Sequence, residues 1–371
     1  MSEGFKIFII CVGLSLFFSS ANVDAQLLQD TATLNLVKKD VDYIYNMQFN
    51  EAREVYSRII KSYPSHPIVY LLRGMITYWE NYPLLHTTPS HVSYEEDMRQ
   101  CIKVSESNNN PDYEAEYLLA NLSARGMLLL FYSDNDLTMD VIPLTVTTYK
   151  YIRRSFDFSS VCADLFYFNG VYDYYREAYP KIYPVYKSMA LLFPDGSIEN
   201  GLKELQTAAR SSVVLSAESY YLLAYIYLNF ENKFPEGLYY SRILHDQYPE
   251  NELYLATYLK NLLLMKQYDE AEKLISASSE KSGNKYFQAQ LLIFKGILQE
   301  KKYRDNKLAQ QYYNKGIHDI NTFGVYGNEY AAYAYFGLSR LCEENGEKET
   351  CKTYRKEAIK LSDFKKINFD R

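Results

Sequence analysis

Two segments far apart in the chain share one layout, and this repetition limits the fold more than any other feature. In MQFNEAREVYSRIIKSYP (47–64), Ala52 is followed by a tyrosine four residues later, and a proline closes the segment. In YLKNLLLMKQYDEAEKLIS (258–276), one helical apolar pattern stops at KQYDEA and a second starts at Ala271. A small residue lets two helix backbones approach closely, and a large residue one turn away fills the gap. The layout therefore predicts helical hairpins repeated along the chain.

This layout resembles the tetratricopeptide repeat, a helix–turn–helix of 34 residues whose second helix carries a small residue, an aromatic residue and a second small residue before a proline. The resemblance extends over about residues 33–362; it is close in 33–67 and in the C-terminal half, and loose between 75 and 200. It implies an all-α fold, a right-handed superhelix of about seven to eight hairpins. A generic α-solenoid or an irregular helical bundle is the alternative.

Small residues mark the expected close contacts in each hairpin. From Gly201 onward, the steps between successive second helices are 36, 34, 38 and 42 residues, close to the tetratricopeptide period. The small residues of second helices are Ala52, Gly201, Gly237, Ala271, Ala309 and Cys351, and those of first helices are Gly74, Gly170, Gly296 and Gly337.

Two stretches break the regular repeat. In ENYPLLHTTPSHVSYEED (80–97), the second helix starts later than a regular hairpin allows. Between Gly170 and Gly201 the step is 31 residues, against 12 in a regular hairpin. The excess corresponds closely to YPKIYPVYKSMALLFPDG (179–196), which predicts an inserted helix starting at Pro184. Insertions in repeat proteins lie on one face and often carry function.

The N-terminus has the features of a secretory signal. A 12-residue apolar run, IFIICVGLSLFF (7–18), follows Lys6 and precedes SSANVDAQ. Val23 to Ala25 fits a small-x-small cleavage site, and Ser19 to Ala21 is a second option. The run is too short to span a bilayer comfortably. We predict that residues 1–25 are a cleaved signal peptide, with an uncleaved anchor as the alternative. A signal before such repeats resembles periplasmic tetratricopeptide proteins of Gram-negative bacteria, which implies a periplasmic protein or one on the periplasmic face of the outer membrane.

The mature chain is expected to contain three parts. Residues 26–160 form irregular hairpins, residues 161–215 form a central repeat with the inserted helix, and residues 216–371 form a C-terminal array. All three belong to one continuous superhelix, because each repeat buries its apolar face on its neighbour.

The four cysteines of the mature chain fall into two groups. Cys101 and Cys162 lie in helical stretches and are expected to be small packed residues. Cys342 and Cys351 flank EENGEKET, a turn between two helices. Antiparallel helices bring such positions together, so a Cys342–Cys351 disulfide is feasible in an oxidising compartment.

Tyrosine is the anomaly of the composition, with 39 copies against one tryptophan. Val161, Leu165, Phe168, Tyr172, Tyr175 and Tyr179 follow one another at spacings of four and three, which is typical of one helix face. We expect this stripe to be core, and we expect the helix to end at Tyr179, before Pro180.

The inserted helix supplies the candidate partner-binding residues. Tyr183 and Tyr186 lie outside the stripe, and a tyrosine combines an apolar ring with a polar tip that suits interfaces. Lys187 and Arg176 are the nearby basic side chains, and Arg176 is expected to be solvated.

The first-helix positions that hold a peptide carboxylate in some tetratricopeptide proteins are apolar or small in this sequence. They are Leu34, Val37, Val41, Ile44 and Tyr45 in the first repeat, and Ala331, Ala334, Leu338, Leu341 and Cys342 in the last. The resemblance therefore does not extend to binding of chaperone tails. An apolar groove of this kind suits a helix or an extended segment, including one from the same chain.

Several function classes are not supported by the sequence. A net charge of −6 without long basic runs disfavours nucleic acid and anionic membranes as partners. No GxSxG, HExxH, GxGxxG, P-loop or CxxC motif occurs. His86 and His91 in HTTPSH lack well-spaced acidic or cysteine partners and are interpreted as a solvated loop instead of a metal site. We predict a protein that is not an enzyme and has no cofactor.

The sequence thus favours an exported scaffold that binds another protein in the cell envelope through its concave face or its insertion. A receptor that stacks a small molecule or glycan on tyrosines is the alternative, and a hydrolase with an unrecognised site is a third. Tyrosines packed between helices would count against the receptor.

Overall fold

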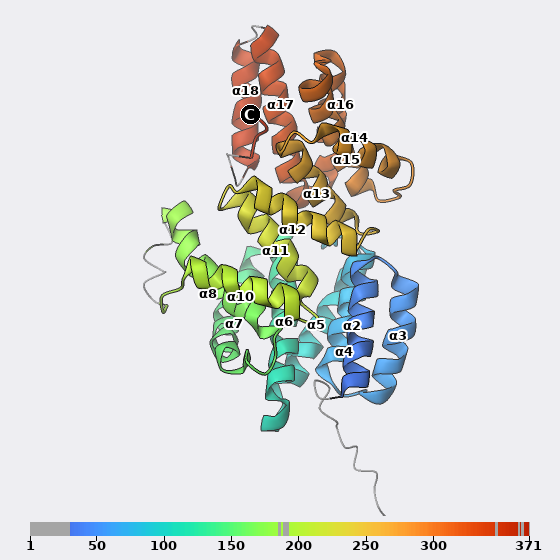
Figure 1. Ribbon diagram of the computed structural model, residues 1–371, viewed down its shortest axis with the longest axis vertical. Helices are drawn as coiled ribbons and strands as arrows, with labels where there is room; N and C mark the ends of the chain where they lie inside the picture. The colour runs from blue at the N-terminus through green and yellow to red at the C-terminus, as the bar shows by residue number, and fades with distance from the viewer. Residues whose placement is uncertain are drawn as a thin grey trace, which may run out of the picture.

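The computed structural model describes residues 30–184, 187, 193–345, 348–362, 364 and 367–370, and within them it contains helices and no strand (Figure 1). The N-terminal helices are α2 (Thr31–Tyr45), α3 (Phe49–Ser62), α4 (Pro67–Glu80), α5 (Ser90–Glu106), η1 (Pro111–Tyr113), α6 (Glu114–Asp134), α7 (Thr138–Phe158), α8 (Leu165–Ile182) and α10 (Ile198–Ser211). The C-terminal helices are α11 (Ser216–Asn229), α12 (Phe234–Gln247), α13 (Glu252–Leu264), α14 (Tyr268–Ser279), α15 (Lys285–Leu298), η3 (Gln299–Tyr303), α16 (Asn306–Ile320), η4 (Asn321–Gly327), α17 (Asn328–Asn345) and α18 (Lys348–Leu361).

Consecutive helices pack against each other as pairs. In the part of the chain that the structure describes, the pairs are α2/α3, α4/α5, α6/α7, α8/α10, α11/α12, α13/α14, α15/α16 and α17/α18. First helices also contact the first helix of the next pair, as in α2 with α4 and α15 with α17. The predicted all-α fold of seven to eight hairpins is confirmed, while its assignment to the tetratricopeptide family stays a prediction.

Capping side chains explain where several first helices begin. Asp30 accepts a hydrogen bond from the Ala32 amide at the start of α2, and Asn251 does the same for Tyr254 in α13. Such side chains satisfy amide groups that have no partner inside the helix. The predicted turn at KQYDEA is confirmed, since α13 ends at Leu264 and α14 begins at Tyr268.

The predicted small residues lie at close helix contacts. A Cβ atom on Gly170 would lie 2.8 Å from the carbonyl oxygen of Gly201, and one on Gly201 would lie 2.5 Å from the backbone nitrogen of Tyr174. A larger residue at either position would force α8 and α10 apart. Side chains or hypothetical Cβ atoms are similarly enclosed at Ala52, Gly74, Gly237, Ala271 and Ala309.

One tyrosine connects three successive helices in the C-terminal repeats. Cβ atoms on Gly296 of α15 and Gly337 of α17 would lie 2.6 and 2.4 Å from ring atoms of Tyr313 in α16. The Tyr313 hydroxyl donates to Glu300 over 2.7 Å, and the Arg340 guanidinium also binds Glu300, at 2.6 and 2.9 Å. The glycines therefore make room for a ring whose hydroxyl belongs to a buried, fully paired polar network.

The expected core stripe on α8 is wrong in detail. The helix begins at Leu165, so Val161 precedes it and is 70% exposed, and Tyr179 is also exposed. The buried face instead contains Phe168, Tyr174 and Ala178 among its members, because Gly170 and Tyr174 face Gly201 of α10.

The expected helix end at Tyr179 is also wrong. α8 continues through Pro180 to Ile182. A proline this close to the end of a helix disturbs only the final turn, so it does not stop α8 at the preceding residue.

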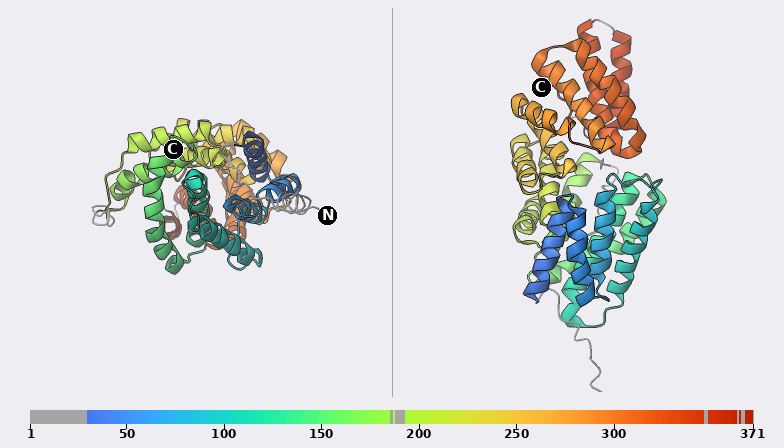
Figure 2. Two further views of the ribbon diagram at one scale, coloured as in Figure 1. Left: turned by 90° about the horizontal axis from the view of Figure 1, so that it is seen from below. Right: turned by 90° about the vertical axis from the view of Figure 1, so that its right-hand side faces the viewer.

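The irregular stretch 80–97 takes part in a contact between the N-terminal and the C-terminal hairpins. The Tyr82 ring lies 6.2 Å from the Tyr286 ring and 5.9 Å from the Tyr326 ring, and the side-chain amide of Asn284 donates to the Tyr82 carbonyl over 3.0 Å. Figure 2 shows the N-terminal helices below the C-terminal ones, joined along one side by the yellow helices. The departure from the repeat thus brings the α4–α5 connection to α15 and η4.

The first-repeat groove is filled by the same chain. Val37, Val41 and Ile44 are buried, as is Tyr45, whose ring lies 5.8 Å from that of Tyr248. The side-chain amide of Asn251 donates to the Tyr45 carbonyl over 2.7 Å, and the Tyr248 hydroxyl donates to Asp42 over 3.0 Å. These contacts place α2 and the α12–α13 region in one core.

The last described residues also cover inner positions of the array. The Phe364 ring lies 5.1 Å from that of Phe230 at the end of α11, and the Phe369 ring lies 5.2 Å from that of Tyr333 in α17. The Asn368 carbonyl accepts a hydrogen bond from Arg340 over 2.6 Å. The last described residues therefore share one core with the predicted groove positions Ala331, Ala334, Leu338 and Leu341.

Candidate functional site

The predicted partner-binding residues lie around the end of α8. Tyr183 is the residue that follows this helix, with its ring 4.7 Å from that of Tyr179, and Lys187 is exposed. Tyr186 and most of the predicted inserted helix lie outside the described residues. A role of this segment in binding stays a prediction.

Arg176 is not solvated as expected. Its guanidinium is largely buried and donates to the Phe193 carbonyl over 2.9 Å and to Asp195 over 3.2 Å. The neighbouring Glu177 accepts a hydrogen bond from the Ile198 amide over 2.7 Å. Both side chains hold the return of the chain into α10, because the stretch before Ile198 packs on this face of α8.

Cys342 and Cys351 lie on α17 and α18, which pack against each other, and both are buried. The Ser339 hydroxyl donates to the Cys351 carbonyl over 3.1 Å, which shows how closely the two helices approach. Their disulfide stays a prediction. Cys101 and Cys162 are buried as expected, and burial raises the pKa of each thiol to about 12.

A second group of residues, distant in sequence, converges on the inner side of the array. It contains tyrosines and carboxyl groups from both halves of the chain, and we call it the inner tyrosine surface. Its members are Tyr82, Asp134, Tyr167, Glu218, Tyr221, Tyr254, Tyr286, Tyr326 and Glu329.

Tyr221 of α11 lies at the centre of this surface. Its hydroxyl interacts electrostatically with three carboxyl groups, those of Glu329 in α17, Glu218 in α11 and Asp134 in α6. Its ring lies 6.0 Å from that of Tyr254. Tyr221 is only partly buried, while burial raises its pKa above the usual range. Tyr221 thus interacts with carboxyl groups that are distant in sequence: Asp134 and Glu218 are 84 residues apart, and Glu218 and Glu329 are 111 residues apart.

Two of the carboxyl groups have no basic partner within the described residues. Burial raises the pKa of Asp134 to about 7, and no opposing hydrogen bond or charge lowers it. Burial also raises the pKa of Glu218 to about 7, although its carboxylate accepts a 3.1 Å hydrogen bond from the Tyr45 hydroxyl. Both side chains stay partly exposed. Glu329 differs, because Lys260 contacts it at 3.1 Å.

One buried polar group next to these carboxyls lacks a hydrogen-bond partner among the described residues. Tyr254 is 1% exposed and its hydroxyl makes no hydrogen bond with them, although it interacts electrostatically with Glu218, Tyr221 and Tyr167. A buried polar group without a hydrogen-bond partner costs free energy. This surface therefore has hydrogen-bonding capacity that the described residues do not use.

The predicted histidine loop contacts other parts of the chain. His86 is exposed, and its backbone amide donates to Asn135 over 2.8 Å, while the His91 ring lies 2.8 Å from the Thr88 carbonyl. The described residues contain no cluster of His, Cys, Asp or Glu suited to a metal ion. The helices that the structure describes are each too short or too polar to cross a bilayer.

Comparisons with known proteins give no family for this chain. No protein-family model matches the sequence, and no curated protein matches it significantly.

Sequence reasoning missed the inner tyrosine surface. Its residues come from the α4–α5 connection and from α6, α8, α11, α13, α15, η4 and α17, and they share no local motif. The available signal was the segment YYLLAYIY (220–227), in which polar-tipped aromatics occupy first-helix positions beside Glu218. Their convergence depends on the curvature of the whole array, which spacing within one hairpin does not encode.

Proposed function

We propose that this protein is an exported, non-catalytic scaffold of tetratricopeptide-like repeats that binds an extended, basic segment of a partner protein in the cell envelope. The observation that carries the proposal is the convergence of Asp134, Glu218 and Glu329 on Tyr221. Export rests on the signal-like residues 1–25. The tetratricopeptide likeness rests on the repeated spacing and on the paired helices.

The charge of the site favours a basic segment. Asp134 and Glu218 lack a basic partner among the described residues, and Lys260 reaches only Glu329. A lysine or arginine side chain would supply the missing charge, and tyrosine rings attract cations through their faces. Both interactions strengthen in a partly desolvated site.

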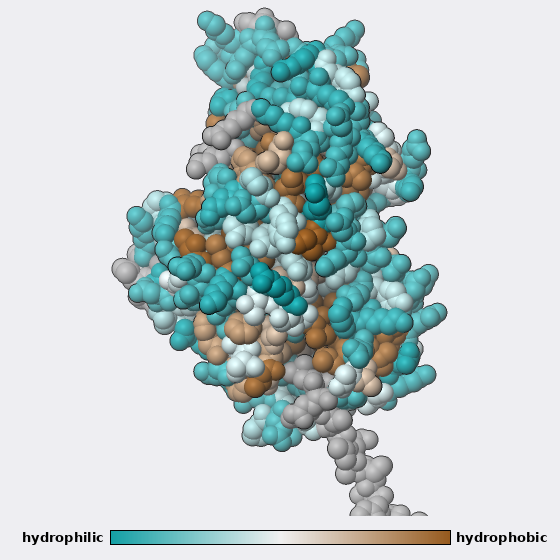
Figure 3. All heavy atoms as spheres, viewed as in Figure 1, coloured by the Kyte–Doolittle hydropathy of each residue, from teal (hydrophilic) through white to brown (hydrophobic). Residues whose placement is uncertain are grey.

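The recessed position favours an extended segment over a folded domain. Tyr82, Tyr221 and Tyr326 are partly exposed, whereas Tyr254 and Tyr286 are buried. A stable interface between folded proteins covers roughly 800 Å² on each partner, which such narrow exposure does not offer. On the face shown in Figure 3, apolar residues form small patches separated by polar ones, so that face offers no large apolar docking surface either.

The packing of the tyrosines counts against the alternative receptor that stacks a ligand on many open rings. The largest fully buried side chains include Tyr45, Tyr94, Tyr174, Tyr313 and Tyr333, which pack between helices. These tyrosines are therefore structural, whereas the inner tyrosine surface combines partly exposed rings with partly exposed carboxyl groups that have no basic partner among the described residues.

Site-specific photocrosslinking tests the proposal. Tyr221 is replaced by p-benzoylphenylalanine in cells that express the protein, and Tyr239, which is 61% exposed on α12, is replaced in a matched control. We expect position 221 to crosslink a partner through a peptide rich in lysine or arginine, and position 239 not to do so. Adducts from position 239 alone, or none from 221, would sink the proposal.

A second experiment separates the inner tyrosine surface from the insertion. Glu218→Gln combined with Asp134→Asn should greatly reduce the crosslink, because both substitutions remove charge and keep shape. Tyr183→Ala combined with Tyr186→Ala should leave it unchanged. The reverse pattern would assign binding to the insertion instead.

A further inference from the structure

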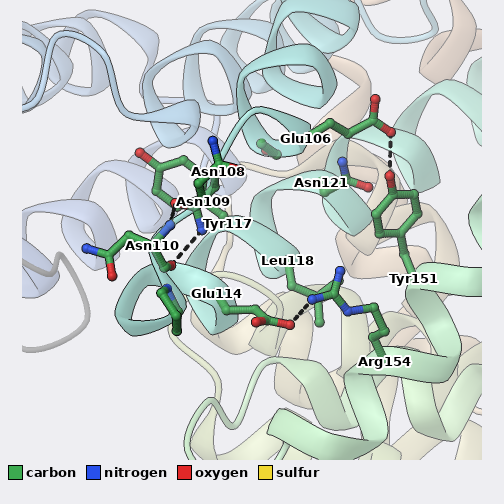
Figure 4. A pocket seen from close by; sticks show the side chains of 12 residues that line it. Glu106, Asn108, Asn109, Asn110, Glu114, Tyr117, Leu118, Asn121, Tyr151 and Arg154 are labelled. Atoms are coloured by element: carbon green, nitrogen blue, oxygen red, sulfur yellow. Dashed lines mark hydrogen bonds and ion pairs between the residues drawn. The ribbon is translucent and has the colours of Figure 1, made fainter.

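A polar pocket lies on the N-terminal half, away from the inner tyrosine surface. It has a volume of about 200 Å³ and is formed by the end of α5, the turn that leads through η1 into α6, and the facing side of α7 (Figure 4). Asn108, Asn109 and Asn110 form one wall, and Tyr151 and Arg154 of α7 face them. The volume is below the ~300–1,000 Å³ typical of drug-sized ligands, so it suits a single small ring.

The charges around this pocket are already balanced. Arg154 pairs with Glu114, and Arg125 donates to Glu106 over 2.8 Å. The Tyr151 hydroxyl also donates to Glu106, over 2.6 Å. Burial alone would raise the pKa of Glu106, but these two hydrogen bonds outweigh it and the pKa is lowered, so the group stays ionised. A charged ligand would have to break an existing pair, whereas a neutral ligand would not.

The walls still offer hydrogen-bonding capacity of both kinds. Among the described residues, no hydrogen bond involves the side-chain amide of Asn109, and Asn110 uses only its oxygen, which accepts from the Asp112 amide. Both Glu106 contacts fall on the same carboxylate oxygen, Oε1, which leaves Oε2 as an acceptor. Asn121 is 2% exposed, and its nitrogen has only a long contact of 3.5 Å, to the Ile102 carbonyl. A suitable ligand therefore presents both donors and acceptors.

Aromatic rings complete the lining. Tyr117 and Tyr151 both border the pocket, and the Tyr117 ring is held by a stacked contact with Tyr113 at 6.2 Å. The Tyr151 ring is held by two cations, with the Arg125 guanidinium 4.7 Å and the Lys150 ammonium group 4.5 Å from its centre. A fixed aromatic face suits the apolar C–H face of a sugar ring.

We infer that this pocket binds one residue of a neutral carbohydrate. Sugar hydroxyls donate and accept hydrogen bonds, as the amides and the free carboxylate oxygen require. The ring has an apolar face for tyrosine and no charge to disturb the two ion pairs. Free monosaccharides and the terminal residues of a glycan share this chemistry.

Saturation-transfer NMR with the full mature protein tests the inference. The probes are the methyl glycosides of glucose, galactose, mannose and N-acetylglucosamine, each at about 10 mM because small polar ligands of this size bind weakly. We expect saturation of the ring protons of at least one glycoside. No saturation of any of the four, or displacement of the signal by inorganic phosphate, would overturn the inference.

Two variants locate the binding. Asn109→Trp fills the mouth of the pocket and should raise the dissociation constant at least about tenfold. Asn50→Trp places the same side chain at an exposed position on α3 and should leave the constant within about twofold. Far-ultraviolet circular dichroism checks that both variants keep their helices. Equal binding by both variants would overturn the assignment to this pocket.

An oligosaccharide of the glycoside that binds distinguishes the two sources. Tighter binding of a tetrasaccharide than of the methyl glycoside, abolished by Asn109→Trp, assigns the pocket to a glycan end. Equal affinities assign it to a free sugar. Binding of the tetrasaccharide that survives Asn109→Trp would contradict the pocket as the site.

Discussion

Glu300 and Glu218 both lie within the folded protein, but they differ in their partners and in the direction in which their pKa is shifted. Glu300 receives hydrogen bonds from Arg340 and Tyr313, and these interactions lower its pKa although burial opposes them. Glu218 has one hydrogen bond, from Tyr45, and burial raises its pKa to about 7. The comparison shows that the fold supplies a counter-charge where a carboxylate is structural. Under the proposed function, the carboxyl group of Glu218 is available to a basic partner.

Asp40 adds a third case to this comparison, because its carboxyl group is fully buried. Neither of its carboxylate oxygens has a hydrogen-bond partner among the residues that the structure describes, and burial raises its pKa to about 8. Unlike Glu218, it has no exposed surface. An unpaired carboxyl is therefore a binding candidate only when a ligand can reach it.

The largest expected effect of a single substitution on stability comes from Arg340→Met. It removes the guanidinium from the buried Glu300 carboxylate, leaves Lys301 as the remaining cation at 3.0 Å, and should lower the free energy of unfolding by about 3 kcal/mol. Urea denaturation followed by circular dichroism measures this loss. Arg53→Met, which breaks an exposed pair with Glu80, should cost less than about 1 kcal/mol. If the two variants lost similar stability, Glu300 would not depend on Arg340.

Asp40 should make stability depend on pH. Its pKa is raised in the folded protein, from 3.8 to about 8, so the folded state binds a proton that the unfolded state releases. Its contribution is fully present below about pH 4 and is lost as the pH rises to about 8, by roughly 6 kcal/mol at most. Asp40→Asn cannot lose a proton, so this part of the pH dependence should disappear.

The measurement for Asp40 is the slope of unfolding free energy against pH, between pH 5 and pH 8, in wild type and Asp40→Asn. The slope is informative because the new amide carries its own, pH-independent cost of burial. The account expects a shallower decline in the variant. Parallel curves would mean that Asp40 is paired or hydrated in solution.

The smallest expected effect on stability concerns two glycines, one at a helix–helix contact and one away from such a contact. Gly296→Ala places a methyl group against the Tyr313 ring and should destabilise the protein by about 1–3 kcal/mol. Gly126→Ala, in α6, meets no atom within 4 Å and should stabilise it by roughly 0.5–1 kcal/mol. Thermal unfolding of both variants checks the signs. Stabilisation by Gly296→Ala would show that the α15–α16 contact is looser than described.

The sequence predicts the local part of this structure well. Ala52, Gly201 and Ala271 identify hairpin contacts because close approach of two helices leaves a direct mark on residue size. The prediction of the α8 stripe is wrong because residue spacing shows that a helix has an apolar face but not which face its partner helix covers. The prediction that Arg176 is solvated is wrong for the same reason, because the chain that returns to α10 covers this side chain and accepts its hydrogen bonds.

The inner tyrosine surface could not be predicted for a different reason. Its members are brought together by the contact of Tyr82 with Tyr286 and by that of Tyr45 with Tyr248. Both contacts join hairpins that are distant in sequence, and they depend on small rotations that accumulate from repeat to repeat.

The most direct test of the central claim is the pH dependence of binding to a basic peptide. A fluorescein-labelled peptide of alternating lysine and glycine is titrated with the protein at pH 6 and pH 8, and fluorescence anisotropy reports the affinity. Because Asp134 and Glu218 have pKa values of about 7, ionisation of one of them should raise the affinity roughly tenfold over this range. Glu218→Gln combined with Asp134→Asn should bind weakly and equally at both pH values. Equal affinity of wild type at both pH values, or of wild type and this variant at pH 8, would contradict the account.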